Sequence, residues 1–171
     1  MRNLAVLALL LLGLACGGRP EATSAGPTSD LPPADLRQVN EARPGEALDL
    51  GPHLSRSRTT LVEFYSDRCP PCREMERVME YLAEQNRDLA IRRVDIDRRG
   101  ASGIDFDSPL AEQYRVEAVP SFRIYDPQGR LVAEGSAAKD RVREWYSQAQ
   151  LFEHAEDPGM KSISDRYRQP R

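Results

Sequence analysis

Residues 59–72 read TTLVEFYSDRCPPC, and two local patterns meet in this run. The first seven residues are rich in β-branched and aromatic side chains and include no Gly or Pro, which predicts a buried strand over 59–65 that carries one carboxylate, Glu63. Beyond the run, apolar residues recur at spacings of three and four over 73–86, the stripe of an amphipathic helix. The two prolines of the CPPC segment suit the first turn of that helix. The two cysteines are therefore expected at a junction between a strand and a helix.

The rest of the globular part continues the alternation of strands and helices. The predicted elements are a strand over 89–96, a short helix over 110–114, strands over 119–125 and 130–134 joined by a turn at 126–129, and a closing helix over 139–152 capped by Ser136. This order predicts a right-handed parallel crossover followed by an antiparallel pair. A mixed sheet of this kind needs helices on both faces, so the predicted fold class is α/β. The charged residues of 92–99 are expected at a solvated rim.

The N-terminus has the pattern of an export signal. Met1-Arg2-Asn3 is followed by an apolar run over 4–15 that ends at Cys16. The run is too short to cross a hydrocarbon core of about 30 Å as a helix. Ala15 directly before Cys16 resembles the lipobox of bacterial lipoproteins, which implies that Cys16 becomes a lipidated N-terminus. The alternative is an ordinary signal peptide cleaved nearby, with no role for Cys16.

The sequence therefore divides into four segments. These are a signal peptide over 1–15, a flexible tether over 16–46 rich in Pro, Gly, Ser, Thr and Ala, a globular domain over 47–152, and a polar tail over 153–171. Export places the domain in the periplasm or another extracytoplasmic space, held to a membrane by the lipid. The chain has 24 Lys and Arg against 27 Asp and Glu, a formal net charge of -3, so nucleic acid is not an expected partner.

The spacing of Cys69 and Cys72 gives them a chemistry of their own. Two thiols at i and i+3 across the first turn of a helix have Cα atoms about 5 to 6 Å apart, within the range of a disulfide. The positive end of the helix dipole favours the thiolate at Cys69, and Arg68 and Arg73 add to this effect. We therefore expect Cys69 to be the nucleophile, with a lowered pKa that Cys72 does not share.

Three other uses of the cysteine pair compete with a redox role. A c-type haem site needs His after the second Cys, and Arg73 stands there. A zinc or copper site needs two more ligands, for which the mature chain offers His53 and His154. A purely structural disulfide across a two-residue gap constrains the unfolded chain very little. We expect no metal and no cofactor, although metal binding and a structural disulfide stay open as alternatives.

The run Val62-Glu63-Phe64-Tyr65 followed by Cys69-Pro70-Pro71-Cys72 resembles thioredoxin, and Val119-Pro120-Ser121 resembles the cis-proline loop of that family. The resemblance covers residues 47–150 and implies the three-layer thioredoxin-like fold. Two positions depart from the family pattern: Arg68 replaces a Trp, and Pro70 replaces a Gly. Both leave the direction of electron flow open.

The resemblance also implies roles for individual residues. In a thiol-disulfide oxidoreductase of this family Cys69 attacks, Cys72 resolves, and the two form a redox-active disulfide. Val119 and a cis Pro120 hold the substrate chain in extended form. Glu63 is expected to be buried, with a raised pKa, and to exchange protons with Cys72, where the family has a buried Asp. The alternative for Glu63 is an ion pair with Arg93, which would lower that pKa.

The connection over 98–109 is longer than the one in thioredoxin. It begins at the sheet edge where the cysteines are expected, and it includes the apolar residues Ile104 and Phe106. We expect this insertion to form part of the substrate site. The alternative is that both residues lie in the core and the loop is only length variation.

Together these features predict an extracytoplasmic, lipid-anchored oxidoreductase that exchanges disulfides with exported proteins. Its expected partners are exported protein thiols or disulfides and a membrane thiol reductase or oxidase. The alternative is a non-catalytic or metal-handling binding lipoprotein that keeps the fold for recognition. Trapping of partners by a Cys72→Ser variant separates the two hypotheses.

Overall fold

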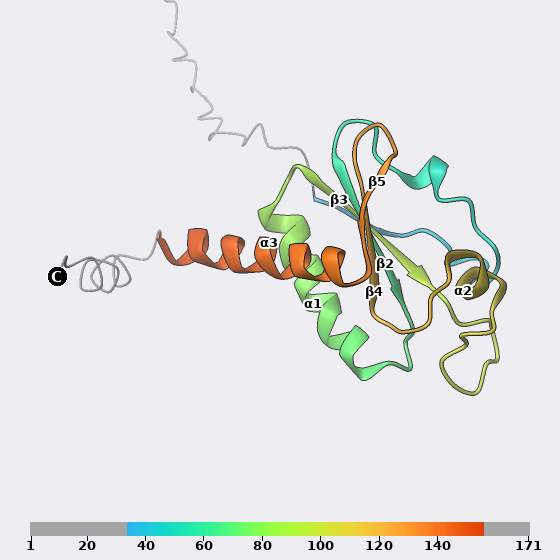
Figure 1. The fold of residues 1–171 in the computed structure, drawn as a ribbon. Helices are drawn as coiled ribbons and strands as arrows, with labels where there is room; N and C mark the ends of the chain where they lie inside the picture. Colours follow the sequence, from blue (N-terminus) through green and yellow to red (C-terminus); the bar gives the residue numbers. More distant parts are fainter. Residues whose placement is uncertain (1–33, 156–171) are drawn as a thin grey trace, which may run out of the picture. The chain divides into compact units, whose positions relative to one another are not determined.

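The computed structural model describes residues 34–155, with side chains up to residue 150. Along the chain the elements are β1 (Asp35–Gln38), the 3₁₀ helix η1 (Gly51–His53), β2 (Thr59–Tyr65), α1 (Pro70–Gln85), β3 (Leu89–Asp95), α2 (Pro109–Tyr114), β4 (Ser121–Tyr125), β5 (Leu131–Glu134) and α3 (Gly135–Ala155) (Figure 1). The predicted signal peptide, Cys16 and the tail from residue 156 lie outside the described residues.

The five strands form one mixed sheet in the order β1-β3-β2-β4-β5. β3 pairs in parallel with both β1 and β2, whereas β4 runs antiparallel to β2 and β5 antiparallel to β4. The predicted crossover from β2 through α1 to β3 and the predicted hairpin of β4 and β5 are both confirmed. In the hairpin turn the Gly129 N–H donates to the Asp126 carbonyl at 2.9 Å, and Gly129 has a φ of 80°, which suits a residue without a side chain.

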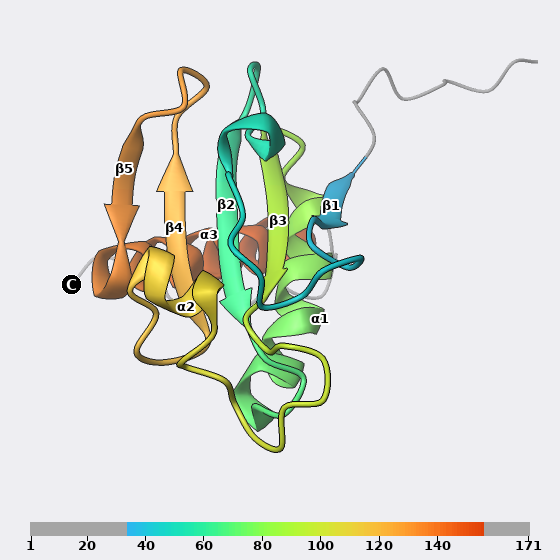
Figure 2. The ribbon, with the colours of Figure 1, turned by 90° about the vertical axis from the view of Figure 1, so that its right-hand side faces the viewer.

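Helices cover both faces of the sheet, as Figure 2 shows. On one face α1 and α3 pack against alternate residues of the strands, and the buried cluster includes Leu61, Met79 and Val142. On the other face α2 and the segment before β2 cover a second cluster that includes Phe64 and Leu110. The alternation of side chains along β2 sends its odd-numbered residues toward α1 and its even-numbered residues toward α2. The three-layer α/β fold is therefore confirmed.

The tether predicted over 16–46 extends too far along the sequence, because residues 34–46 are part of the folded unit. β1 adds to the edge of the sheet beside β3. The Asn40 side chain then exchanges two hydrogen bonds with the backbone of Asp95, at 2.7 and 3.0 Å. Gly45 has a φ of 71°, and a Cβ there would lie 2.5 Å from the backbone nitrogen of Arg98. Backbone pairing and polar contacts hold this stretch in place, together with Leu36 and Val39, which pack against the two apolar clusters.

Charged residues of β3 are buried, so the prediction of a solvated rim was wrong for this strand. Arg92 is 5% exposed, and its guanidinium donates to both carboxylate oxygens of Asp35, each at 2.9 Å. Arg58 donates to the same carboxylate at 2.8 Å. The pKa of Asp35 is lowered even though burial acts to raise it, because these arginines stabilise the carboxylate. This cluster fastens β1 to the sheet.

The closing helix is longer than predicted at both ends. It begins at Gly135, directly after β5, so Ser136 lies inside the first turn instead of capping it. Trp145 is half-buried and packs against the cluster beneath α1 and α3. Of the helices within residues 34–155, none combines the length and the apolar character that a membrane span requires.

Candidate active site

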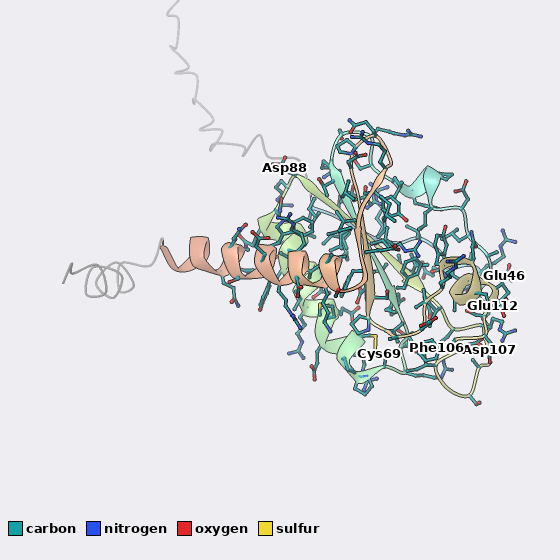
Figure 3. The ribbon with its side chains drawn as sticks, in the orientation of Figure 1. Glu46, Cys69, Asp88, Phe106, Asp107 and Glu112 are labelled. Carbon is teal, nitrogen blue, oxygen red and sulfur yellow. A yellow bond between two sulfur atoms is a disulfide. The ribbon has the colours of Figure 1, made fainter. Side chains whose placement is uncertain are left out.

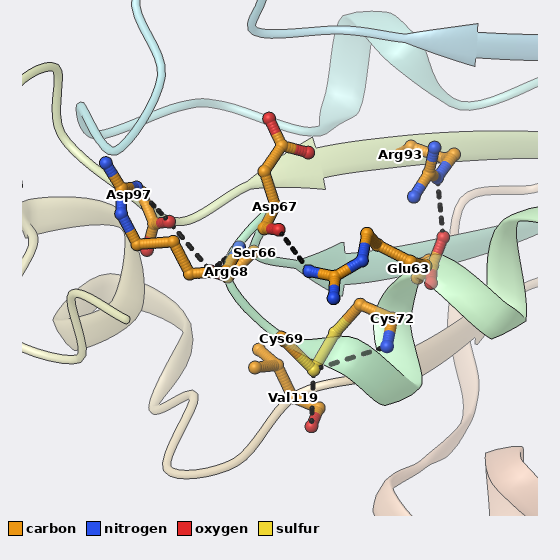
Figure 4. Close-up of a disulfide and its surroundings, with 10 residues drawn as sticks. Glu63, Ser66, Asp67, Arg68, Cys69, Cys72, Arg93, Asp97 and Val119 are labelled. Atoms are coloured by element: carbon orange, nitrogen blue, oxygen red, sulfur yellow. Dashed lines mark hydrogen bonds and ion pairs between the residues drawn. A yellow bond between two sulfur atoms is a disulfide. The ribbon is translucent and has the colours of Figure 1, made fainter. Parts of the chain in front are cut away.

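The two cysteines lie where β2 gives way to α1. A tight turn brings the Cys69 N–H to the Ser66 carbonyl at 3.1 Å, and Cys69 is the N-cap of α1. Its sulfur accepts a hydrogen bond from the Cys72 N–H at 3.3 Å. Prolines fill the two intervening positions and carry no N–H, which leaves Cys72 as the amide that reaches the sulfur. Cys69 and Cys72 form a disulfide, with Cα atoms 5.3 Å apart (Figure 4).

The disulfide sits in a small apolar cluster near the surface. Cys69 is 3% and Cys72 0% exposed, and Tyr65 is buried beside them. Ile104 and Val119 pack against this cluster from two other segments of the chain. Both cysteines are therefore buried, and Cys69 keeps the small exposure that Cys72 lacks.

The segment before β4 lies against the same sulfur. The Val119 carbonyl oxygen is 3.5 Å from the sulfur of Cys69. The Val119-Pro120 peptide bond is cis, as the resemblance implied. The structure thus brings together Cys69, Cys72, Val119 and Pro120, four of the residues singled out from the sequence.

Glu63 is fully buried in β2, on the face of the sheet that α1 covers. Arg93 is its register partner on β3 and donates to Glu63 Oε2 at 2.8 Å. The same guanidinium donates to Glu76 of α1 at 2.7 Å and lies over the Tyr65 ring, 4.1 Å from its centroid. Glu76 is one helical turn from Cys72, so Arg93 links the Glu63 carboxyl group to the first turns of α1.

Burial and pairing act on Glu63 in opposite directions. Burial raises the pKa of Glu63, and the Arg93 guanidinium offsets only part of that rise. Glu63 is therefore buried, as predicted, and also paired with Arg93, as in the alternative. The lowered pKa that the alternative expected from this ion pair is wrong. Glu63 Oε1 is buried and meets no hydrogen-bond partner within the described part of the chain. One oxygen is thus fixed by Arg93, and the other is free to carry a proton.

Arg68 is turned away from the Cys69 sulfur, contrary to the prediction that it adds positive charge there, whereas the same expectation for Arg73 stays a prediction. Arg68 donates to the Asp97 carboxylate at 2.8 Å, and Arg73 donates to the Asp67 carbonyl at 2.9 Å. Figure 4 shows the Arg68 side chain extending toward Asp97 and away from Cys69. The helix terminus and the Cys72 amide act on the sulfur, and Arg73 keeps its charge because the carbonyl that it binds is neutral.

The insertion begins beside the disulfide, as predicted, because β2 and β3 end at the same edge of the sheet. Its two apolar residues differ: Ile104 is half-buried against the cysteine cluster, whereas Phe106 is 38% exposed. Figure 3 shows Phe106 at the same end of the fold as Cys69. The loop encloses a shallow hollow of about 540 Å³ lined by residues 98–105. The alternative in which both residues lie in the core is therefore wrong for Phe106.

Asp97 is a site residue that the sequence analysis missed. It is 3% exposed and contacts both the turn before Cys69 and the insertion. Its position directly after a strand, at the edge where the cysteines lie, was a signal that pointed to it. Across residues 34–155, no group of three or more His, Cys, Asp or Glu side chains is arranged to hold a metal ion.

Comparison with known proteins agrees with this geometry. Residues 52–148 match the thioredoxin family model. The chain is 31% identical over 86 residues to thioredoxin of Chlamydia trachomatis, covering 50% of this chain and 74% of that protein. It is 29% identical over 90 residues to mitochondrial thioredoxin-2 of Schizosaccharomyces pombe, covering 53% of this chain and 60% of that protein.

Among solved structures, a mutant thioredoxin from Halobacterium salinarum is similar, with 28% identity and a TM-score of 0.46 over 67% of this chain and 93% of that one. The chain spans 60%, 59% and 64% of the lengths of three thioredoxins that it matches, from fission yeast, rice and Arabidopsis thaliana. Because the family model covers more than half of its length, the chain belongs to the thioredoxin family.

Proposed function

We propose that the protein is a thiol-disulfide oxidoreductase that acts outside the cytoplasm on exported proteins. The observation that carries this proposal is the disulfide between Cys69 and Cys72 at the start of α1, with the Val119 carbonyl 3.5 Å from the Cys69 sulfur. A bond across two residues adds little stability, so its placement beside the Val119 carbonyl favours chemistry over structure. Membership of the thioredoxin family supports the same activity.

The reaction is a pair of thiol-disulfide exchanges. In the reducing direction, the Cys69 thiolate attacks one sulfur of a substrate disulfide, and the other substrate sulfur leaves as a thiolate that takes up a proton. The Cys72 thiolate then attacks the Cys69 sulfur, which breaks the mixed disulfide and releases the second substrate thiol. Two electrons pass to the substrate, and the Cys69–Cys72 disulfide is restored. The reverse sequence oxidises a substrate dithiol, and the potential of the couple sets the direction.

Glu63 is suited to manage the proton of Cys72. The resolving thiol must lose a proton before it attacks, and it is 0% exposed, so bulk water does not reach it directly. Burial raises the pKa of Glu63 toward the working pH, and a base is a more effective proton acceptor the closer its pKa lies to that pH. Arg93 stabilises the carboxylate before it accepts the proton.

The substrate chain is proposed to lie between the Val119-Pro120 segment and the insertion. The Val119 backbone offers a strand-like edge beside the sulfur, a geometry that binds extended polypeptides by main-chain hydrogen bonds. Ile104 borders the cysteine cluster on the other side, and Phe106 exposes apolar surface nearby. An extended peptide fits this arrangement better than a small polar molecule does.

The location and the partners rest on the sequence pattern at the N-terminus. Lipidation of Cys16 would hold the domain at a membrane, where exported proteins and a membrane thiol reductase or oxidase are within reach. Detergent partitioning tests the anchor: Cys16→Ser should move the protein from the membrane fraction to the soluble fraction. Retention of the variant on the membrane would show that something other than Cys16 anchors it.

The activity is tested by trapping. Cys72→Ser removes the resolving thiol, so mixed disulfides at Cys69 should accumulate as reductant-sensitive adducts with exported proteins. The matched control, Cys69→Ser, keeps one thiol of the pair but removes the nucleophile and should give none. Equal adducts with both variants, or none with either, would contradict the proposed function.

A further inference from the structure

Asp97 joins the turn before the dithiol to the insertion that borders it. One carboxylate oxygen, Oδ2, accepts from the Ser66 hydroxyl at 2.7 Å and from Arg68 Nη1 at 2.8 Å. The other oxygen, Oδ1, accepts from the Asp105 N–H at 2.9 Å. The residue is 3% exposed, so these contacts are made in a protected environment where an ion pair is screened less by solvent.

The partner of Asp97 is the residue that precedes the nucleophile. The Arg68 side chain is 41% exposed, so the fold leaves it room to take other directions. A guanidinium turned toward the Cys69 sulfur would favour the thiolate, because an opposite charge within a few ångströms stabilises the ionised form. In the structure the guanidinium is turned to the Asp97 carboxylate instead and extends away from Cys69.

We propose that Asp97 is a positioning residue for the dithiol, which holds the Arg68 guanidinium away from the Cys69 sulfur and so withholds its charge from the thiolate. The inference deepens the proposed function and rests on it for its biological meaning. It assigns to Asp97 the control of how reactive the nucleophile is at a given pH, and hence of how oxidising the couple is.

Several other charged groups near the dithiol are paired or held by hydrogen bonds, whereas Asp67 is exposed beside Arg68, and burial raises the pKa of Asp95, which contacts the Asp97 N–H, to about 6. On the strands, Glu63 and Arg93 pair with each other, and Tyr65 lies beneath the Arg93 guanidinium. In the turn and the first helical turn, Arg73 is held by the Asp67 carbonyl.

On the remaining segments, Glu117 is exposed two residues before Val119, and Arg98 is paired with Asp105 in the insertion. Next to the nucleophile, the Arg68–Asp97 ion pair can be broken by a single substitution that keeps the size of the side chain.

The test measures the pH dependence of Cys69 alkylation in the reduced full-length chain, with iodoacetamide as the probe and peptide mapping to separate Cys69 from the other thiols. Asp97→Asn keeps the size of the side chain and an oxygen acceptor for the Asp105 N–H while removing the charge. The midpoint of the alkylation rate should fall by about 0.5 to 1 pH unit, a discounted value because Arg68 is partly exposed.

A second background separates positioning from the direct effect of one lost charge. With Arg68→Gln in place there is no guanidinium to release, so Asp97→Asn should shift the midpoint by less than half as much. Equal shifts with Arg68 and with Gln at position 68 would overturn the proposal, as would the absence of a shift. If Asp97→Asn does not fold, Asp97→Ser removes the same charge and keeps a hydroxyl acceptor.

The matched control is Asp105→Asn, which breaks the neighbouring ion pair with Arg98 and leaves Arg68 in place. Its alkylation midpoint should equal that of the wild type. A shift as large as that of Asp97→Asn would mean that the insertion, and not Arg68, governs the sulfur, and would overturn the proposal. Alkylation requires no disulfide exchange, so this result stands apart from any failure of the proposed function.

Discussion

Replacement of Arg93 by Met should destabilise the protein in a way that grows with pH. The substitution keeps an apolar stem of similar length but removes the guanidinium that donates to Glu63 at 2.8 Å. Glu63 is 0% exposed, so its carboxylate would be left buried without a counter-charge. Breaking a buried pair in this way typically costs about 3 to 5 kcal/mol, unless the remaining group neutralises itself by binding a proton.

Protonation sets a ceiling on the cost. Holding Glu63 neutral at pH 7 means holding it protonated 2.5 pH units above its ordinary pKa of 4.5, which at about 1.36 kcal/mol per unit amounts to roughly 3.4 kcal/mol. At pH 5 the same calculation gives roughly 0.7 kcal/mol. Because the wild type already has a raised pKa at Glu63 and carries part of this cost, the expected loss is up to about 3 kcal/mol at pH 7 and under about 1 kcal/mol at pH 5.

The sign follows from proton binding. A carboxyl group whose pKa is raised on folding stabilises the native state fully below its unfolded pKa, and that contribution is lost as the pH rises through the folded pKa. Arg93→Met raises the folded pKa further, so the difference in the free energy of unfolding between variant and wild type should widen from pH 5 to pH 8.

Urea denaturation, followed by the fluorescence of the single Trp and by circular dichroism, measures this free energy at each pH. The double variant Glu63→Gln with Arg93→Met should lose the extra pH dependence. Glu76→Gln removes the charge of the other partner of Arg93. The Glu76 side chain is 49% exposed, so this substitution should cost under about 1 kcal/mol. A loss for Arg93→Met that is the same at pH 5 and pH 8 would refute the reasoning.

Three further outcomes are expected. Glu63→Gln should slow resolution of the Cys69 mixed disulfide on the order of 100-fold and flatten its pH dependence between about pH 6 and 9, as measured by stopped-flow kinetics; unchanged rates would exclude the proton-transfer role. Asp35→Asn leaves Arg92 buried without its anion, so it should cost about 3 kcal/mol and speed hydrogen exchange in β1, whereas full protection would show that backbone pairing alone holds that strand. Replacing residues 100–106 by a short turn should reduce exchange with insulin, a protein disulfide, but not with oxidised glutathione; equal retention of both activities in a folded variant would remove the insertion from the substrate site.

The sequence predicted the elements whose signals are local. β2 follows from its unbroken β-branched and aromatic composition, and α1 follows from apolar residues spaced by three and four. The same local logic placed the two cysteines at the start of the helix, because two prolines suit its first turn, and in the structure Cys69 is the N-cap. The predicted bounds of β2 agree with the structure, and α1 begins at the first of those prolines.

The misses share a physical cause, since each depends on partners far away in the chain. β1 contains one large apolar residue, and it is held by Asp35 and Arg92, which are 57 positions apart. Arg93 was expected at a solvated rim, with a pair to Glu63 only as the alternative, because that anion is 30 positions away on the neighbouring strand. Periodicity measures burial of apolar surface, so it does not reveal a charge that is buried by pairing.

Disulfide exchange between the Cys69–Cys72 couple and a protein is measured most directly by following both sides of one turnover. The full-length protein is mixed with an excess of insulin in two reactions, the reduced protein with oxidised insulin and the oxidised protein with reduced insulin, and each is quenched by acid for mass spectrometry of both components. In the direction that the potential of the couple allows, the wild type should change by about 2 Da as its disulfide forms or opens, insulin should change by two thiols in the opposite sense, and Cys69→Ser should do neither. A wild type that leaves insulin unchanged in both reactions would contradict the proposed exchange.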